Sequence, residues 1–90
     1  MEHGHKVYVA VRADFREDGM MLPRSVVWED RVRYPIDRVL GIRPGFAAKA
    51  GGQGDKYTVL IKGRQTCLYF ERSASLQGNV IGRWFVESKV

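Results

Sequence analysis

The chain has a single cysteine, Cys67, and no histidine beyond position 5. One cysteine cannot form an internal disulfide, and its place inside a predicted strand favours a small packed side chain over a nucleophile. Without a histidine in the folded body, the usual general base near neutral pH is missing. One cysteine and two terminal histidines also fall short of the roughly four ligands of a zinc site. We therefore expect no enzymatic activity, no bound metal and no cofactor.

The sequence contains no apolar run near the ~20 residues of a membrane span. It does not open with a basic segment followed by an apolar run, which is the pattern of a secretory signal. Together with the lone Cys67, these features predict a cytoplasmic protein with no membrane partner.

Ninety residues correspond to one domain, which buries about 60–65 % of the surface that its unfolded chain exposes. We expect a disordered N-terminus over residues 1–5 and a single β-domain over residues 6–90. His3 has the spacing from a free amino terminus that can chelate Cu(II) or Ni(II). A disordered terminus offers such a site no supporting residues, so we assign it no metal.

The segment Lys56–Glu71 predicts a β-hairpin with a two-residue turn, Gly63-Arg64. This register would place Ile61 opposite Thr66 and would allow a cross-strand ion pair between Lys56 and Glu71. One face of the hairpin is then apolar and belongs to the core, whereas the other face is mixed. The apolar face collects Tyr57, Val59, Ile61, Thr66, Leu68 and Phe70.

Four further strands are predicted from alternation and turn residues, at residues 6–15, 25–28, 32–42 and 83–90. Between the second and third, either Glu29-Asp30 forms the turn or a three-residue loop pairs Val26 with Tyr34; we prefer the loop. Pro35 removes a ladder donor, so we expect a bent third strand with Pro35 at an edge.

Three irregular segments lie between these strands. Met20–Pro23 is apolar and ends at a proline, so it could plug the open end of a barrel. Phe46–Ala50 could form one helical turn. The run Gly51–Gly54 precedes Lys56 but lacks the following Ser/Thr and helix of a P-loop, so we interpret it as a connector.

Six short strands without an amphipathic helix predict an all-β fold, a small antiparallel barrel or strongly curved sheet of SH3-like or OB-like size. Its first and last strands should lie together. The predicted core is Val7, Val9, Val11, Phe15, Val26, Trp28, Val32, Tyr34, Ile36, Tyr57, Val59, Ile61, Leu68, Phe70, Trp84 and Val86.

The formal net charge is +5 and the pI is about 9.7, which meets one criterion for a nucleic-acid-binding protein. Aromatic rings interleaved with basic groups on a β-surface suit single-stranded nucleic acid. Tyrosines on a sheet can equally serve to cover it. The candidate nucleic-acid residues are Lys6, Tyr8, Arg12, Lys56, Lys62 and Tyr69.

Several motifs follow one another in a distinctive order: Val27-Trp28, Tyr34-Pro35-Ile36-Asp37-Arg38-Val39, Leu68-Tyr69-Phe70-Glu71 and Arg83-Trp84-Phe85-Val86-Glu87. In this order the chain resembles a family of short bacterial all-β proteins of unknown function. The resemblance covers most of the chain and implies no catalytic residues. A looser similarity to small β-domains encoded beside DNA-repair polymerase accessory proteins implies, by association, a nucleic-acid partner.

The leading hypothesis from the sequence is a non-catalytic binding module for nucleic acid. The alternative is a protein-interaction or homodimerising module that pairs through an edge strand. The strand that contains Pro35 and the last strand are the candidate edges.

Overall fold

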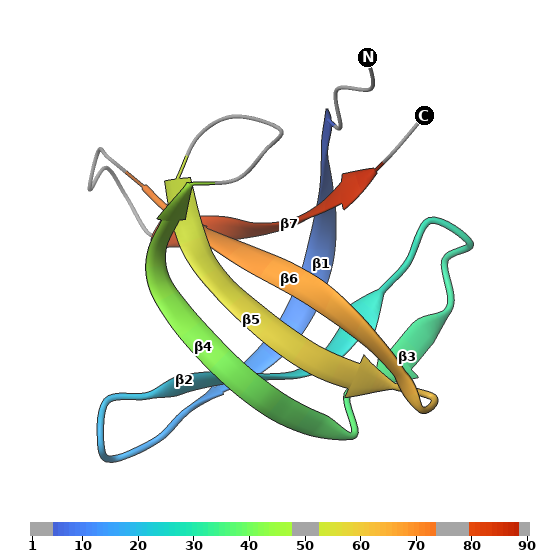
Figure 1. Cartoon of the computed structure of the whole chain (residues 1–90), viewed down its shortest axis with the longest axis horizontal. Coiled ribbons are helices and arrows are strands. Elements are labelled where there is room, and N and C mark those ends of the chain that lie inside the picture. The colour runs from blue at the N-terminus through green and yellow to red at the C-terminus, as the bar shows by residue number, and fades with distance from the viewer. Residues whose placement is uncertain (1–4, 48–52, 74–79, 89–90) are drawn as a thin grey trace.

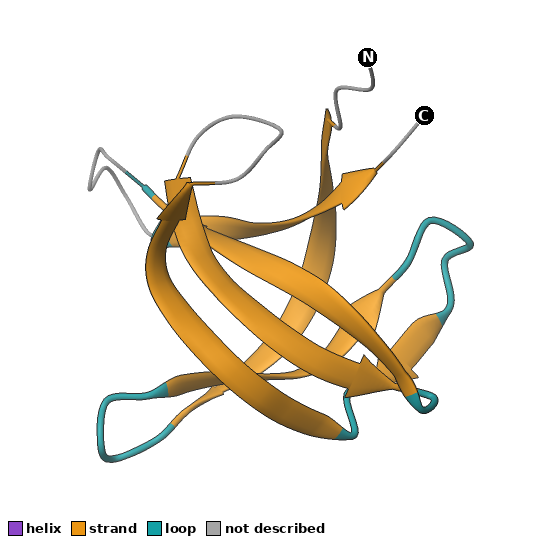
Figure 2. Cartoon of the chain, in the orientation of Figure 1, coloured by secondary structure: helices purple, strands orange, loops and turns teal. Residues whose placement is uncertain are grey.

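The computed structural model describes residues 5–47, 53–73 and 80–88. Within these residues it contains strands and loops but no helix, as Figure 2 shows. The strands (Figure 1) are β1 (His5–Phe15), β2 (Met21–Val27), β3 (Arg33–Pro35), β4 (Arg38–Ala47), β5 (Gln53–Ile61), β6 (Arg64–Arg72) and β7 (Gly82–Ser88). The predicted all-β class is confirmed.

All neighbouring strands are antiparallel and form one sheet, which curls into a half-barrel (Figure 1). The order across the sheet is β3-β2-β1-β7-β6-β5-β4. As predicted, the first and last strands lie together, because β1 pairs with β7 from His5 opposite Ser88 to Val9 opposite Trp84. β1 begins one residue earlier than expected. The last strand is therefore an interior strand, and the prediction that it forms an edge is wrong.

The two edges of the sheet, β3 and β4, are consecutive pieces of the chain. The third predicted strand is bent after Pro35, as expected, and the bend divides it into these two strands. At the bend, the Ile36 amide donates to Arg24 O at 2.8 Å and the Asp37 amide donates to Leu60 O at 2.8 Å. These bonds tie β2 and β5 to one short segment, which brings the ends of the curled sheet together. This division explains why the described residues contain seven strands and not six.

The loop between β2 and β3 follows the preferred alternative. Val26 lies opposite Tyr34, and the Trp28 amide donates to Val32 O at 3.1 Å. Arg31 takes a φ of 66° within this loop, a conformation that non-glycine residues adopt uncommonly.

The central hairpin turns one residue earlier than predicted. Ile61 lies opposite Arg64, so the turn residues are Lys62 and Gly63, with φ values of 52° and 75°. Positive φ at both positions fits a type I′ turn. The Lys62 amide donates to Asp37 Oδ2 at 3.1 Å, a contact with the β3–β4 bend that the hairpin sequence alone does not reveal.

The predicted hairpin faces nevertheless survive this correction. Each residue pairs with a partner two positions away from the predicted one, and side chains on a strand alternate with a period of two. The apolar face therefore lines the inside of the half-barrel, as expected. The predicted Lys56–Glu71 pair is wrong, because Lys56 lies opposite Tyr69 and Glu71 lies opposite Arg83.

The core fills the inside of the curled sheet. Its most buried members are Val26, Tyr57, Val59, Leu68, Phe70 and Trp84, and most other predicted core residues pack around them half-buried. Two predicted core residues are exposed instead: Phe15 by 68 % and Val32 by 48 %. Both flank a turn: Phe15 is the last residue of β1, where it pairs with Met21, and Val32 lies in the loop just before β3.

A second apolar cluster lies on the outer face of the sheet and was not predicted. Phe85 is 0 % exposed and Tyr69 is 4 % exposed, and they pack together with Cys67 outside the main core. The alternation of the last strand had placed Phe85 outward, and outward positions are usually solvated in a one-sided sheet.

Two predictions for irregular segments need correction. Met21–Pro23 does not form a plug, because these residues belong to β2 and pair with the end of β1 across a register shift. Phe46 and Ala47 extend β4 and do not begin a helical turn; the remainder of that segment, like Gly51, Gly52 and His3, lies outside the described residues.

Candidate functional site

The six candidate nucleic-acid residues do not form one surface. Lys6, Tyr8 and Tyr69 gather on the outer face where β1, β7 and β6 are neighbours. Arg12 is exposed on the second half of β1, opposite Ser25 of β2. Lys56 lies on β5 beside Tyr69, and Lys62 lies in the β5–β6 turn.

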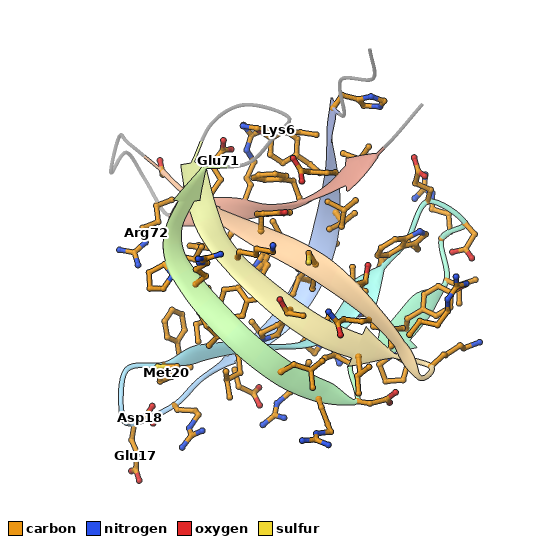
Figure 3. The ribbon with its side chains drawn as sticks, viewed as in Figure 1. Lys6, Glu17, Asp18, Met20, Glu71 and Arg72 are labelled. Atoms are coloured by element: carbon orange, nitrogen blue, oxygen red, sulfur yellow. The ribbon has the colours of Figure 1, made fainter. Side chains whose placement is uncertain are left out.

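The outer face carries a group of interacting side chains that we call the outer cluster: Lys6, Tyr8, Tyr69, Glu71, Arg83, Phe85 and Glu87. Glu71 is its polar centre. Its carboxylate accepts hydrogen bonds from Lys6 Nζ and, at 2.9 Å, from the Tyr8 hydroxyl (Figure 3). The Arg83 guanidinium lies 3.8 Å away.

The pKa values at this centre follow the contacts. The hydrogen bond from Lys6 is the main cause that lowers the pKa of Glu71. The same bond raises the pKa of Lys6. Both groups are therefore held in their charged forms, and each largely cancels the other's charge.

Two rings of the outer cluster, Tyr69 and Phe85, are buried against each other. The Tyr69 ring stacks on Phe85 with a centroid distance of 5.0 Å and an interplanar angle of 10°. Its hydroxyl donates to Glu87 Oε1 at 3.0 Å. Burial is the main cause that raises the pKa of Tyr69, and this hydrogen bond is the second cause. A ring that is 4 % exposed offers no face for a base to stack on, so the role predicted for Tyr69 needs correction.

Tyr8 is the most open ring of the outer cluster, at 42 % exposed, but one of its faces is occupied. The Arg83 guanidinium carbon lies 3.9 Å from the ring centroid, and Arg83 also donates to the Tyr8 hydroxyl at 3.2 Å. The ring edge meets Phe85 at a centroid distance of 6.1 Å. The outer cluster thus joins β1, β6 and β7 on the face opposite the core.

A hollow of about 360 Å³ lies beside the β5–β6 turn, at the end of the half-barrel. We call it the end cleft. It is lined mainly by Trp28, Tyr34, Lys62, Arg64, Gln65 and Thr66. The two aromatic side chains come from the β2–β3 hairpin and are half-buried, whereas the four polar residues come from the tip of the β5–β6 hairpin.

The cations of the end cleft, Lys62 and Arg64, form no ion pair within the part of the chain that the structure describes. Lys62 Nζ lies 5.2 Å from the Tyr34 ring centroid. Asp37 accepts the Lys62 amide. Asp30 accepts the Tyr34 hydroxyl and the Val32 amide.

The nearby acids accept hydrogen bonds from neutral groups, and Asp30 also interacts with the charge of Lys62. The Tyr34 hydrogen bond is the main cause that lowers the pKa of Asp30. The same bond raises the pKa of Tyr34. The Tyr34 ring is held in place by this bond, and the positive charge of Lys62 and Arg64 remains available to a ligand.

Of this site, the sequence analysis identified only Lys62. Trp28 and Tyr34 had been placed in the core or at its rim, and Arg64 had been assigned to the turn. The signal that could have found the site is the preferred three-residue loop, which puts both aromatic residues on one face at the end of a hairpin.

Other kinds of site have little support in the part of the chain that the structure describes. It contains no group of three or more His, Cys, Asp or Glu residues that could hold a metal ion. No described helix is long and apolar enough to cross a membrane. Gly54 has a packing role in β5, because an added Cβ would lie 2.9 Å from Phe70 O.

No protein-family model matches the chain, and neither the curated proteins nor the solved structures contain a match. The resemblance to a bacterial family of unknown function therefore stays a prediction.

Proposed function

We propose that the protein is a non-catalytic binding module for single-stranded nucleic acid, and that a base enters the end cleft. One observation carries the proposal: Trp28 and Tyr34 line an open hollow beside Lys62 and Arg64, which form no ion pair among the described residues. Proteins that bind single strands combine aromatic rings, on which bases stack, with cations that follow the backbone.

The dimensions of the end cleft suit this ligand. About 360 Å³ lies near the lower end of the range for small-molecule sites, which is enough for one base and its sugar. Lys62 and Arg64 sit at the tip of a hairpin, so they can reach phosphates on either side of a bound base. The exposed Arg31 of the neighbouring loop adds positive charge at the same end.

The alternative function, pairing through an edge strand, is opposed by the form of both edges. β3 has three residues and ends at Pro35, whereas β4 has two register irregularities along its pairing with β5. Short strands, prolines and bulges are the features by which proteins discourage edge-to-edge association.

An NMR titration tests the proposal. The two tryptophans report on separate places, because Trp84 is buried in the core, whereas Trp28 lines the end cleft and the hollow that adjoins it. We expect mixed-sequence single-stranded DNA or RNA to shift the Trp28 indole signal and the amides of residues 62–66, saturably and at physiological salt. Diffuse shifts that vanish with salt would mean that the ligand only senses the net charge.

A pair of variants separates local from overall charge. Arg64→Ala should weaken binding and reduce the salt dependence of the affinity, because it removes a cation of the end cleft. Arg16→Ala is the matched control. Arg16 pairs with Asp18 in the β1–β2 turn, and its substitution lowers the net charge by the same amount as Arg64→Ala. Equal losses in both variants would argue against the end cleft.

A further inference from the structure

Strands β6 and β7 are paired over only part of their length. Their ladder runs from Arg72 opposite Gly82 to Tyr69 opposite Phe85 and ends there. β6 continues to Arg64 with β5 as its neighbour, and β7 continues to Ser88 with β1 as its neighbour. The two strands therefore diverge. A hollow of about 410 Å³ lies between them, and we call it the interstrand slot.

The backbone of β6 presents a strand edge to this slot. In a hairpin with a two-residue turn, the pair next to the turn is hydrogen-bonded, and the bonding direction alternates along the strand. From the Ile61–Arg64 pair, the peptide groups of Gln65 and Cys67 point away from β5. The β6–β7 ladder does not extend to these residues. The Cys67 peptide group therefore faces the slot, and that of Gln65 points the same way at the margin that adjoins the end cleft.

The side chains of the slot define what it would accept. Half-buried Val7, Val9 and Val86 supply an apolar floor. The carboxylates of Glu29 and Glu87 lie along its walls, the latter also accepting the Tyr69 hydroxyl, and none of the described lysines or arginines lines it. In a protein of net charge +5, this acidic lining is the reverse of the surrounding surface, and it would repel the phosphates of a nucleic acid.

We propose that the interstrand slot binds an extended segment of a partner protein, in which apolar residues alternate with a lysine or arginine. The segment would add to β6 as a new strand and bond to the peptide groups of Gln65 and Cys67. Strand addition of this kind takes its affinity from main-chain bonds and its selectivity from alternate side chains. Here the apolar side chains meet the valine floor and the basic side chain meets Glu29 and Glu87.

A model peptide tests this proposal. The probe is an acetylated and amidated Val-Thr-Val-Lys-Val-Thr-Val segment, titrated into the isotopically labelled full chain. We expect saturable NMR shifts at Val7, Cys67 and Val86, which line the slot but not the end cleft, and slower hydrogen exchange at the Gln65 and Cys67 amides. Absence of shifts at millimolar peptide, or shifts centred on the end cleft, would overturn the proposal.

Two altered peptides test the two interactions that the proposal combines, charge recognition and main-chain hydrogen bonding. Replacement of the central lysine by glutamate should weaken binding about fivefold, the size expected for one exposed ion pair. Methylation of the peptide nitrogens on the edge that faces β6 should abolish the slower exchange. If either altered peptide binds as tightly as the parent peptide, the slot does not recognise the lysine charge or the main-chain N–H groups, respectively, and the proposal fails.

A protein variant provides the reciprocal test. Glu29→Lys reverses one wall charge at an exposed loop position and should weaken the lysine peptide while improving the glutamate peptide. The matched control is Glu17→Lys. Glu17 is exposed in the β1–β2 turn (Figure 3), and its substitution changes the net charge by the same amount as Glu29→Lys. Equal effects of the two variants would show that only the overall charge matters, and would overturn the proposal.

Discussion

The outer cluster and the end cleft contain the same kinds of residue, aromatic rings and basic side chains, yet they differ in what those residues meet. In the outer cluster, Lys6 and Arg83 converge on Glu71. In the end cleft, Lys62 and Arg64 form no ion pair among the described residues. The rings differ too: Phe85 and Tyr69 are buried and Tyr8 is covered on one face by Arg83, whereas Trp28 and Tyr34 are half-buried beside an open hollow.

This contrast shows that aromatic and basic composition does not identify a binding surface. The partners of the charges do, because a paired cation has little left to offer a phosphate. A closed cluster should contribute to stability and an open cleft to binding, and substitutions in the two regions can test that division.

The largest expected effect is on the free energy of unfolding and arises in the outer cluster. Phe85→Ala should lower the free energy of unfolding by about 3–5 kcal/mol, because Phe85 has no exposed surface and supports both Tyr69 and Tyr8. Chemical denaturation measures this loss. Phe15→Ala is the control; its exposed ring should cost within about 0.5 kcal/mol. If Phe85→Ala alone is too unstable to study, Phe85→Leu should lose about 1 kcal/mol.

The next largest effect is on the free energy of binding and arises in the end cleft. Trp28→Ala should reduce the free energy of binding to a single strand by about 1–3 kcal/mol, the usual contribution of a ring stacked on a base. Tyr8→Ala is the comparison, since Tyr8 is similarly accessible but belongs to the outer cluster. Fluorescence anisotropy of a labelled oligonucleotide measures both. A comparable loss from Tyr8→Ala would restore the outer face as the binding surface and erase the distinction.

A smaller effect is expected when the centre of the outer cluster loses its charge. Glu71→Gln should lower the free energy of unfolding by about 1 kcal/mol at neutral pH, because partly exposed charged hydrogen bonds contribute modestly. The folded-state pKa of Glu71 is lowered, so its contribution is present above the unfolded-state pKa and is lost as the pH falls through the folded-state value. The stabilities of both proteins should therefore converge only after the pH has fallen through the lowered folded-state pKa of Glu71. A constant difference down to pH 2 would mean that Glu71 acts by packing alone.

The sequence predicted the parts of the fold that depend on local alternation. Strand faces, the bend after Pro35 and the pairing of Val26 with Tyr34 all follow from neighbouring residues. The turn at Lys62 could not be predicted in this way, because it depends on Asp37 from another part of the chain. The burial of Phe85 was missed because alternation gives the face of a residue but not what covers that face.

The candidate site was less predictable than the fold. The sequence correctly placed Lys6, Tyr8 and Tyr69 on one face of the sheet. It does not show that Glu71 would bind Lys6 and Tyr8, or that Glu87 would bind Tyr69. The end cleft joins the tips of two hairpins, β2–β3 and β5–β6, that are distant in the sequence. Such a juxtaposition requires the curl of the sheet, which local patterns do not encode.

The smallest predicted effect distinguishes the two regions most directly, because it has opposite signs at one residue. Lys62 holds a φ of 52° beside Gly63 at 75°, and asparagine tolerates this conformation better than lysine. Lys62→Asn should therefore raise the free energy of unfolding by about 0.5–1 kcal/mol. It should also weaken binding and reduce the slope of log affinity against log salt by about 0.7, the value for one cation on a single strand.

Lys62→Met separates these two consequences, since it removes the charge, keeps a long side chain against Tyr34 and does not ease the turn. It should bind as weakly as Lys62→Asn without the gain in stability. If Lys62→Asn gained stability and still bound a single strand as tightly as the natural protein, the strained lysine would have no part in binding. Loss of affinity in both variants, with a gain of stability only in Lys62→Asn, would mean that the end cleft keeps an unfavourable backbone conformation for the sake of its charge. No residue of the outer cluster should behave in this way, because its charges and rings stabilise the fold that they belong to.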